Sequence, residues 1–318
     1  RLVANGVAVM YVSHRMNEIA QVADVVTVLR DGQVVRTLPV ADADVAVVTE
    51  AMVGEPAAAD ESGARRTAPV STTDLEPALS VIGLADAAAV RDVSFDVAPG
   101  EIVGLAGLLS SGRTETLEVI AGLRRSTGGT IRIGGRAAGR LTPARALARG
   151  VALVPEDRKR DGLVLGLSVE ENIAMSSFSR LSTAGVVRRG ARRRAAERMR
   201  SDLDIKVDDV AVPVGTLSGG NQQKAVIGRC LVAGASIYLL DEPTRGVDVR
   251  AKQQIYEVIR SLADAGNAVV FASSEYEELL LLADRIVVLT DGRSRPAPPV
   301  PDLTLDRLLA EMMKEHTL

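Results

Sequence analysis

A short loop bounded by two glycines lies between an apolar run and a helical stretch, at residues 107–114. The run from Glu101 to Ala106 predicts a strand, and the segment that extends to Ile120 predicts a helix. In this setting, backbone N–H groups and the helix dipole converge on phosphate oxygens, as in a Walker A loop. An ordinary glycine-rich turn is the alternative. The loop consists of Gly107, Leu108, Leu109, Ser110, Ser111, Gly112, Arg113 and Thr114.

Two side chains at the end of this loop have the chemistry to bind a nucleotide and its cation. Thr114 offers a hydroxyl to Mg²⁺, and Arg113 occupies the position where the Walker A pattern has lysine. Arginine keeps the positive charge and can grip two oxygens. Its planar fork, however, cannot sit as a point charge between the β- and γ-phosphates. We therefore expect nucleotide binding to survive this change more readily than fast hydrolysis.

Two adjacent carboxylates follow a second strand-like run, Ser236 to Leu240. A carboxylate at the C-terminal edge of a strand, here Asp241, can hold Mg²⁺. The neighbouring Glu242 can orient or deprotonate an attacking water. The alternative is a buried strand that ends in solvated acids.

A glycine-containing motif precedes these carboxylates and opens a predicted helix. Ser218 is suited to cap that helix, and the two glycines after it allow the backbone to approach a phosphate closely. The motif consists of Leu217, Ser218, Gly219, Gly220, Asn221 and Gln222, followed by Gln223 and Lys224. Downstream, residues 245–248 predict a tight polar turn that ends at Asp248, before a helix that starts at Val249.

Composition restricts the kind of protein that carries these motifs. The 318 residues are 47% hydrophobic and 25% charged, which suits a folded chain with a sizeable core. The net charge of −3 gives no basic field that would favour nucleic acid as the partner. The single cysteine, Cys230, excludes an intrachain disulfide framework and reads as a core residue. We see no apolar stretch near the length of about 18 residues that a membrane span needs.

The chain contains an internal repeat with an offset of 260 residues. Between positions 2 and 32 we find 12 identities without a gap, and each copy predicts a strand, a helix and a second strand. The first strand of each copy is expected at Val7 to Val12 and at Ala268 to Ala272. The identical residues include Ser13 and Glu18 in the first copy, whereas His14 corresponds to Ser274.

The repeat predicts one complete unit and the tail of another. We expect a first unit that ends at residue 54, a linker at 55–78 rich in Ala, Pro, Ser and Thr, and a complete second unit at 79–318. The counterpart of residues 79–261 is missing from the first unit, so we expect a tandem protein cut near its front.

Taken together, the motifs resemble the ATP-binding cassette family. The order is Walker A loop (107–114), signature (LSGGNQQK, 217–224), Walker B strand (IYLLDE, 237–242) and D-loop (246–248), with a switch position one strand later. More narrowly, residues 154–173, the signature and LDEPTRGVDVRAK are similar to the second cassette of bacterial ribose, xylose and galactose importers. The resemblance implies an α/β P-loop NTPase fold with a mixed sheet core and an inserted helical subdomain, and it implies ATP and Mg²⁺ as cofactors.

Three positions depart from the hydrolytic pattern of that family. Arg113 replaces lysine, Glu156 replaces a glutamine that contacts Mg²⁺ and water, and Ser274 replaces a histidine that contacts the γ-phosphate. A carboxylate near the γ-phosphate adds repulsion, and serine offers no cationic contact. With Glu242 still present, we expect this chain's own site to bind ATP and turn it over slowly. The resemblance implies a faster site that uses His14 of the first cassette, closed by the signature of this one.

The resemblance also implies partners and a location. The chain would energise a monosaccharide importer at the cytoplasmic face of the membrane, through transmembrane permease subunits that accept sugar from an extracytoplasmic binding protein. Residues 155–173 would face the permease, and a second cassette of the same or another chain would complete each ATP site. Two alternatives stay open: a non-catalytic truncated binding module, and a soluble tandem cassette protein that acts on ribosomes.

An arginine-rich stretch, Val186 to Arg200, has two interpretations. It forms a solvated helix face, or it contacts anionic lipid or a permease loop.

Overall fold

The computed structural model describes residues 3, 6–12, 16–30, 33–44, 47, 48, 51, 76–183 and 186–314. His14 and the linker residues 55–75 lie outside the described residues. The chain divides into two compact units. One contains residues 1–64 with 247–254, and the other contains residues 65–246 with 255–318.

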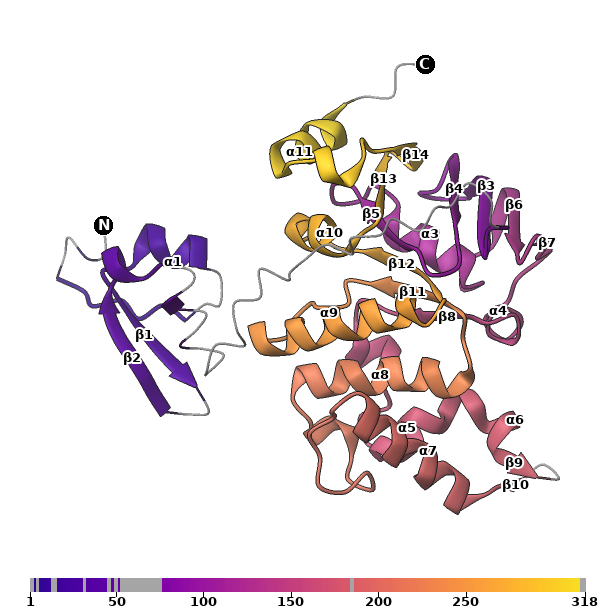
Figure 1. Cartoon of the computed structure of the whole chain (residues 1–318), viewed down its shortest axis with the longest axis horizontal. Helices are drawn as coiled ribbons and strands as arrows, with labels where there is room; N and C mark the ends of the chain where they lie inside the picture. Colours follow the sequence, from indigo (N-terminus) through magenta and orange to yellow (C-terminus); the bar gives the residue numbers. More distant parts are fainter. Residues whose placement is uncertain are drawn as a thin grey trace. The chain divides into compact units, whose positions relative to one another are not determined.

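The larger unit is built on a six-stranded mixed sheet (Figure 1). In spatial order its strands are β14 (Arg293–Pro296), β13 (Arg285–Thr290), β5 (Ile102–Ala106), β12 (Ala268–Ala272), β11 (Ile237–Asp241) and β8 (Val151–Val154). β14 is antiparallel to β13, and the other neighbours are parallel. Every residue of β5, β11 and β12 is buried, because parallel strands covered on both faces require continuous apolar runs.

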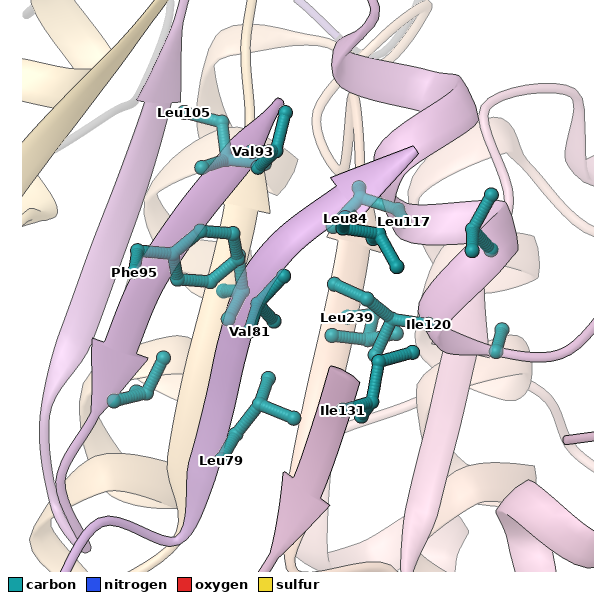
Figure 2. Packing of buried hydrophobic residues seen from close by; sticks show 14 of the residues in the cluster. Leu79, Val81, Leu84, Val93, Phe95, Leu105, Leu117, Ile120, Ile131 and Leu239 are labelled. Atoms are coloured by element: carbon teal, nitrogen blue, oxygen red, sulfur yellow. The ribbon is translucent and has the colours of Figure 1, made fainter. Parts of the chain in front are cut away.

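An antiparallel sheet of four strands belongs to the same core. Its spatial order is β4 (Val93–Val97), β3 (Leu79–Asp86), β6 (Ser126–Ile133) and β7 (Arg136–Ala137). β4 alternates buried and exposed residues, as expected for a strand that covers the core with one face only. Figure 2 shows Phe95 and Val81 of this sheet packed with Leu105 and Leu239 of the mixed sheet. Helix α3 (Arg113–Ile120) completes this cluster with Leu117 and Ile120.

A mostly helical segment lies between β8 and β11 in the chain. It contains η4 (Arg158–Gly162), α5 (Val169–Ala174), η5 (Met175–Ser177), α6 (Phe178–Leu181), β9 (Ser182–Thr183), β10 (Val186–Val187), α7 (Arg189–Asp202), η6 (Val214–Thr216) and α8 (Gly219–Ala233). α5, α7 and α8 pack against one another, and α8 also contacts β8 (Figure 1). The predicted helical insertion between the two motif-bearing strands is confirmed.

Ion pairs account for much of the arginine-rich stretch. Arg192 of α7 approaches Glu170 at 2.5 Å and Glu171 at 3.6 Å, on the helix α5 that it packs against. Further salt bridges are Arg193–Asp209 (3.1 Å), Arg198–Asp202 (3.3 Å) and Arg200–Glu197 (2.8 Å). These contacts support the interpretation of α7 as a solvated helix whose charges are balanced within the helical segment.

The remaining helices of the described chain are α4 (Pro143–Ala148), α9 (Val249–Asp264), α10 (Tyr276–Leu282), η7 (Val300–Asp302) and α11 (Leu305–Met313). Threonine side chains cap two of them: Thr142 accepts from Arg145 N in α4, and Thr304 accepts from Arg307 N in α11. Among the described residues, no helix combines the length and the apolar character that crossing a membrane requires.

The smaller unit contains α1 (Met16–Val22), the antiparallel pair β1 (Val25–Arg30) and β2 (Gln33–Pro39), and η2 (Val40–Asp42). Its buried cluster includes Val26, Val28, Val48 and Ala51. The strand predicted at residues 7–12 is wrong, because these residues are exposed and form no regular structure. The repeated segment, β12, is paired on both sides by β5 and β11. No described strand of the smaller unit pairs with residues 7–12.

Candidate nucleotide-binding site

The loop 107–112 connects the buried strand β5 to helix α3, as the sequence predicts. A Cβ on Gly107 would lie 2.6 Å from the carbonyl oxygen of Leu289 and would overlap the side chain of Ser111. Gly112, at φ 97°, precedes α3 in a left-handed conformation that favours glycine. Gly292 N donates to the Ser111 carbonyl at 3.1 Å and ties the loop to the β13–β14 turn. The glycines therefore allow a tight, anchored loop at the N-terminus of α3.

Ser110 has a backbone conformation that disfavours its side chain. Its φ is 66°, in the left-handed region that a residue with a Cβ adopts at a cost of about 1–2 kcal/mol. We expect Ser110→Gly to raise the free energy of unfolding by about 0.5–1 kcal/mol, after subtracting the greater chain entropy of glycine. Urea unfolding would measure the change. Ser110→Ala keeps the strain and serves as the control, so equal stabilities for the two variants would contradict the prediction.

Thr114 and Asp241 meet at the start of α3 and the end of β11. The Thr114 hydroxyl donates to the Asp241 carboxylate, whose residue is only 3% exposed. Burial, and to a lesser extent the charge of Glu242, raise the pKa of Asp241, whereas the Thr114 hydrogen bond and Arg113 lower it, and the net pKa is about 6. The two predicted Mg²⁺ ligands are therefore in contact, and a cation there would relieve the cost of burying the carboxylate.

Arg113, Glu242 and Ser274 form a connected cluster beside this pair. Ser274 donates from both its backbone N and its Oγ to Oε2 of Glu242, each at 3.0 Å. Nη2 of Arg113 lies 3.6 Å from Oε1 of Glu242, and both side chains are 11% exposed. Nη1 of Arg113 donates to the carbonyl of Ser273 at 2.5 Å. Both oxygens of Glu242 are thus engaged by protein groups.

Glu156 follows β8 and lines a cavity of about 1090 Å³ together with Thr114 and Asp241. Its carboxylate forms an ion pair with the guanidinium of Arg245. The predicted nucleotide-binding position thus lines the same cavity as Thr114 and Asp241, and Arg245, which the sequence argument had not singled out, balances its charge.

The signature motif forms the start of α8. Ser218 precedes the helix, and its Oγ accepts from Nδ2 of Asn221 at 3.0 Å rather than capping a backbone N–H. Gln222 Nε2 donates to the Leu217 carbonyl at 3.1 Å. The first N–H groups of the helix, at Gly219 and Gly220, are therefore free of helical acceptors, as at any helix start.

An arginine outside the predicted site connects the signature to the D-loop. Arg158 of η4 donates to the carbonyls of Arg245 at 2.6 Å and Gly246 at 3.0 Å. A Cβ on Gly219 would lie 2.7 Å from Nη2 of Arg158, so the guanidinium lies against the first signature glycine. Asp248 of the D-loop accepts from Ala251 N at 2.8 Å in the first turn of α9.

A family model and two sequence relatives that match this chain are named as ABC transporter or import ATP-binding proteins. Residues 90–245 match the family described as ABC transporter. The chain is 42% identical over 311 residues to the putative ribose/galactose/methyl galactoside import ATP-binding protein 3 of Agrobacterium fabrum, over 98% of this chain and 61% of that protein. It is 40% identical over 316 residues to the uncharacterized ABC transporter ATP-binding protein YphE of Escherichia coli, over 99% and 62%. The chain spans about 60% of the length of these relatives.

Solved structures with the same fold include a dimeric ATP-binding cassette in a post-hydrolysis state bound to ADP and Pi. Its TM-score is 0.61 at 21% identity, over 70% of this chain and 98% of that one. A nucleotide-free ATP-binding cassette matches with a TM-score of 0.60 at 18% identity, over 69% and 89%. These likenesses confirm the predicted α/β P-loop NTPase fold.

Proposed function

We propose that this chain is an ATP-binding subunit of the ABC transporter family that energises the import of a monosaccharide. The observation that carries the proposal is the assembly of Arg113, Thr114, Asp241, Glu242 and Ser274 at the C-terminal ends of β5, β11 and β12. Ligands of α/β sheets bind at this edge. The relative from Agrobacterium fabrum, named for ribose, galactose and methyl galactoside import, supports a monosaccharide as the transported class.

The residues present fit ATP with Mg²⁺. The loop 107–112 precedes α3, so N–H groups at the helix start can bind phosphate oxygens. The Ser111 Oγ is buried without a hydrogen-bond partner within the described chain, as expected for a group that awaits a ligand. The Thr114 hydroxyl and the Asp241 carboxylate are the oxygen ligands that Mg²⁺ prefers. When bound, Mg²⁺ neutralises charge on the phosphates and on Asp241.

We propose that hydrolysis at this site is slow. Glu242 is the only carboxylate in the cluster placed to orient a water, yet Ser274 and Arg113 already engage both of its oxygens. Arg113 would have to leave Glu242 before its guanidinium could bind the γ-phosphate. Glu156 lines the cavity beside Asp241, where Arg245 pairs with it, so its carboxylate is engaged as well. These contacts favour binding over turnover.

The signature would serve a site on another cassette. The helix start at Gly219 and Gly220 presents N–H groups and a positive dipole end, which suit the γ-phosphate of a nucleotide held by a partner. We propose the arrangement expected from the repeat: a first-cassette tail at residues 1–54, a linker at 55–78 and the second cassette at 79–318. In that arrangement His14 belongs to the partner site.

The proposed partners are permease subunits in the membrane, an extracytoplasmic sugar-binding protein that reaches the permease, and a second cassette. The chain would then lie at the cytoplasmic face of the membrane. Residues 155–173, which include η4 and the start of α5, are the proposed permease contact. Nothing in this scheme requires nucleic acid.

The purified chain tests the proposal. Saturating MgATP is expected to raise the thermal midpoint by roughly 5 °C, because ligand at 100 times Kd adds about 2.7 kcal/mol. Turnover is expected at about 10⁻² s⁻¹ or slower, the range of phosphoryl transfer without complete transition-state contacts. Glu242→Gln is the matched control. Turnover above about 1 s⁻¹ that this variant abolishes would contradict the slow site, and an unshifted midpoint would contradict nucleotide binding.

A further inference from the structure

The carboxylate of Glu278 on α10 accepts three hydrogen bonds from buried hydroxyls. Thr244 Oγ1 donates to Oε1 at 2.6 Å, and the Tyr256 hydroxyl donates to the same oxygen at 2.8 Å. Ser273 Oγ donates to Oε2 at 2.8 Å. None of the four residues is more than 6% exposed. We call this set the Glu278 hub, and it lies outside the residues assigned to nucleotide so far.

The donors fit a charged carboxylate. An ionised carboxylate only accepts hydrogen bonds, and each of the three hydroxyls supplies one donor. Burial and the negative charge of Glu278 together raise the pKa of Tyr256 well above its ordinary value. Burying a carboxylate costs several kcal/mol unless such donors offset it. A leucine at this position would fill the core without that cost, so the charge has a use other than filling space.

Two of the three donors lie on the segments that carry the nucleotide cluster. Thr244 is two residues after Glu242, at the exit of β11. Ser273 directly precedes Ser274 at the exit of β12, and its carbonyl is the acceptor for Arg113. Glu242 has a φ of 47°, a strained conformation that persists only when its surroundings hold it. The hub thus ties together both strand exits between which Glu242 is held.

We propose that Glu278 is a positioning residue for γ-phosphate recognition, which it serves by fixing Ser273 and Thr244. The inference rests on the proposed binding of ATP. With Ser273 fixed, its carbonyl holds the Arg113 guanidinium at the start of α3, beside the loop 107–112. From there the guanidinium can reach the γ-phosphate of a bound nucleotide once it leaves Glu242. The β-phosphate, which the loop N–H groups bind, does not depend on the hub.

The internal repeat supports this role. Ser273 and Glu278 match Ser13 and Glu18 at the offset of 260, whereas Ser274 matches His14. Two of the four hub residues, Ser273 and Glu278, can be compared across the repeat, and both are retained although the neighbouring phosphate-facing residue differs. A requirement to hold the end of the strand in place, whichever side chain contacts the phosphate, accounts for that pattern.

Discrimination between ATP and ADP tests the inference. We would measure the Kd of MgATP and of MgADP by calorimetry for the wild-type chain, Glu278→Gln, Ser273→Ala and the control Glu277→Gln. Glutamine keeps the volume of Glu278 but loses the charge, and charge-assisted hydrogen bonds are about twice as strong as neutral ones. Glu277 is exposed on the same helix. We expect Glu278→Gln to weaken MgATP about tenfold and MgADP less than about twofold, which corresponds to about 1.4 kcal/mol on ATP alone.

Each outcome of these titrations supports or overturns the positioning role of Glu278. A similar loss for both nucleotides, or no loss for either, would overturn the inference, because a purely structural residue would not alter discrimination. If Glu278→Gln does not fold, Ser273→Ala decides: a selective loss of MgATP of about threefold supports the hub, and an equal loss overturns it. If the wild-type chain binds neither nucleotide, the proposed function itself fails. If it binds both, only the positioning role is under test.

Discussion

Replacing Gly107 by alanine is expected to weaken MgATP binding at least about 100-fold in a chain that still folds. The new Cβ would lie 2.6 Å from the carbonyl oxygen of Leu289, a contact that real Cβ atoms essentially never show. Leu289 lies within the buried strand β13, so its backbone cannot yield. The loop 107–112 must move instead, and its N–H groups would no longer all point toward the phosphates.

The cost in stability should be smaller than the cost in binding. Overpacking of this kind destabilises by about 1–3 kcal/mol, which a domain of this size can absorb. Gly166→Ala is the matched control, because its new Cβ meets nothing within 4 Å. Calorimetric titration with MgATP and urea unfolding of both variants check the two effects. A Gly107→Ala chain that binds MgATP as tightly as the Gly166→Ala chain would show that the loop is not a phosphate site.

The sequence was sufficient to predict the elements that carry the site. The apolar runs before Gly107 and Asp241 are continuous, as expected for parallel strands that are covered on both faces. The glycine-bounded loop and the paired carboxylates then had to lie at the same edge of one sheet. The burial of Cys230 is also confirmed, and burial raises the pKa of its thiol to about 11.

The partners of the charged side chains could not be predicted in the same way. Arg113 reaches the carbonyl of Ser273, and Glu156 pairs with Arg245, across 160 and 89 positions of the chain. Periodicity places a residue on an element but does not indicate which neighbour its side chain selects. Glu278 illustrates the limit, because nothing in the sequence of its helix singles it out, and the folded structure brings three hydroxyls to its carboxylate.

The strand expected at residues 7–12 failed for a related reason. Its sequence is as apolar as that of β12, but β12 hydrogen-bonds to neighbours on both sides. Strand formation depends on partners as much as on the pattern of one segment. The helix and the second strand of the repeat are confirmed, because α1 and α10, like β1 and β13, begin and end at residues 260 apart. The first strand of the first copy is the part of the repeat that is wrong.

Asp241→Asn is expected to stabilise the chain in the absence of divalent cations, while it removes the benefit of Mg²⁺. Burial raises the pKa of Asp241 from 3.8 to about 6 in the folded chain. Above about pH 6 the carboxylate is charged in both the folded and unfolded states, and the folded state bears the cost of burying it. A rise in the pKa from 3.8 to about 6 corresponds to roughly 2–3 kcal/mol of lost folding stability. Asparagine carries no charge and still accepts from Thr114, so it avoids this cost.

The pH dependence of the stability gain distinguishes the removal of a buried charge from an improvement in packing. Because the folded pKa is raised, the folded chain binds more protons than the unfolded chain between about pH 4 and 6. The advantage of asparagine should therefore be complete at pH 8, about half as large at pH 5 and about a fifth as large at pH 4. A packing effect would be the same at every pH. Urea unfolding in EDTA at these pH values measures the stability difference between the wild type and Asp241→Asn. The control is Asp208→Asn, because Asp208 is exposed.

In the chain with bound ATP, Asp241→Asn should remove stabilisation rather than add it, because it removes the effect of Mg²⁺. With saturating ATP, Mg²⁺ should raise the thermal midpoint of the wild type by several degrees over ATP with EDTA, and this increment should vanish in Asp241→Asn. A residue that only supports the fold would lose stability on substitution and keep its response to Mg²⁺. The combination of a gain without the cation and a loss of its effect is specific to a carboxylate held in the core for a metal ion. Equal Mg²⁺ responses in the two chains would exclude Asp241 as the ligand.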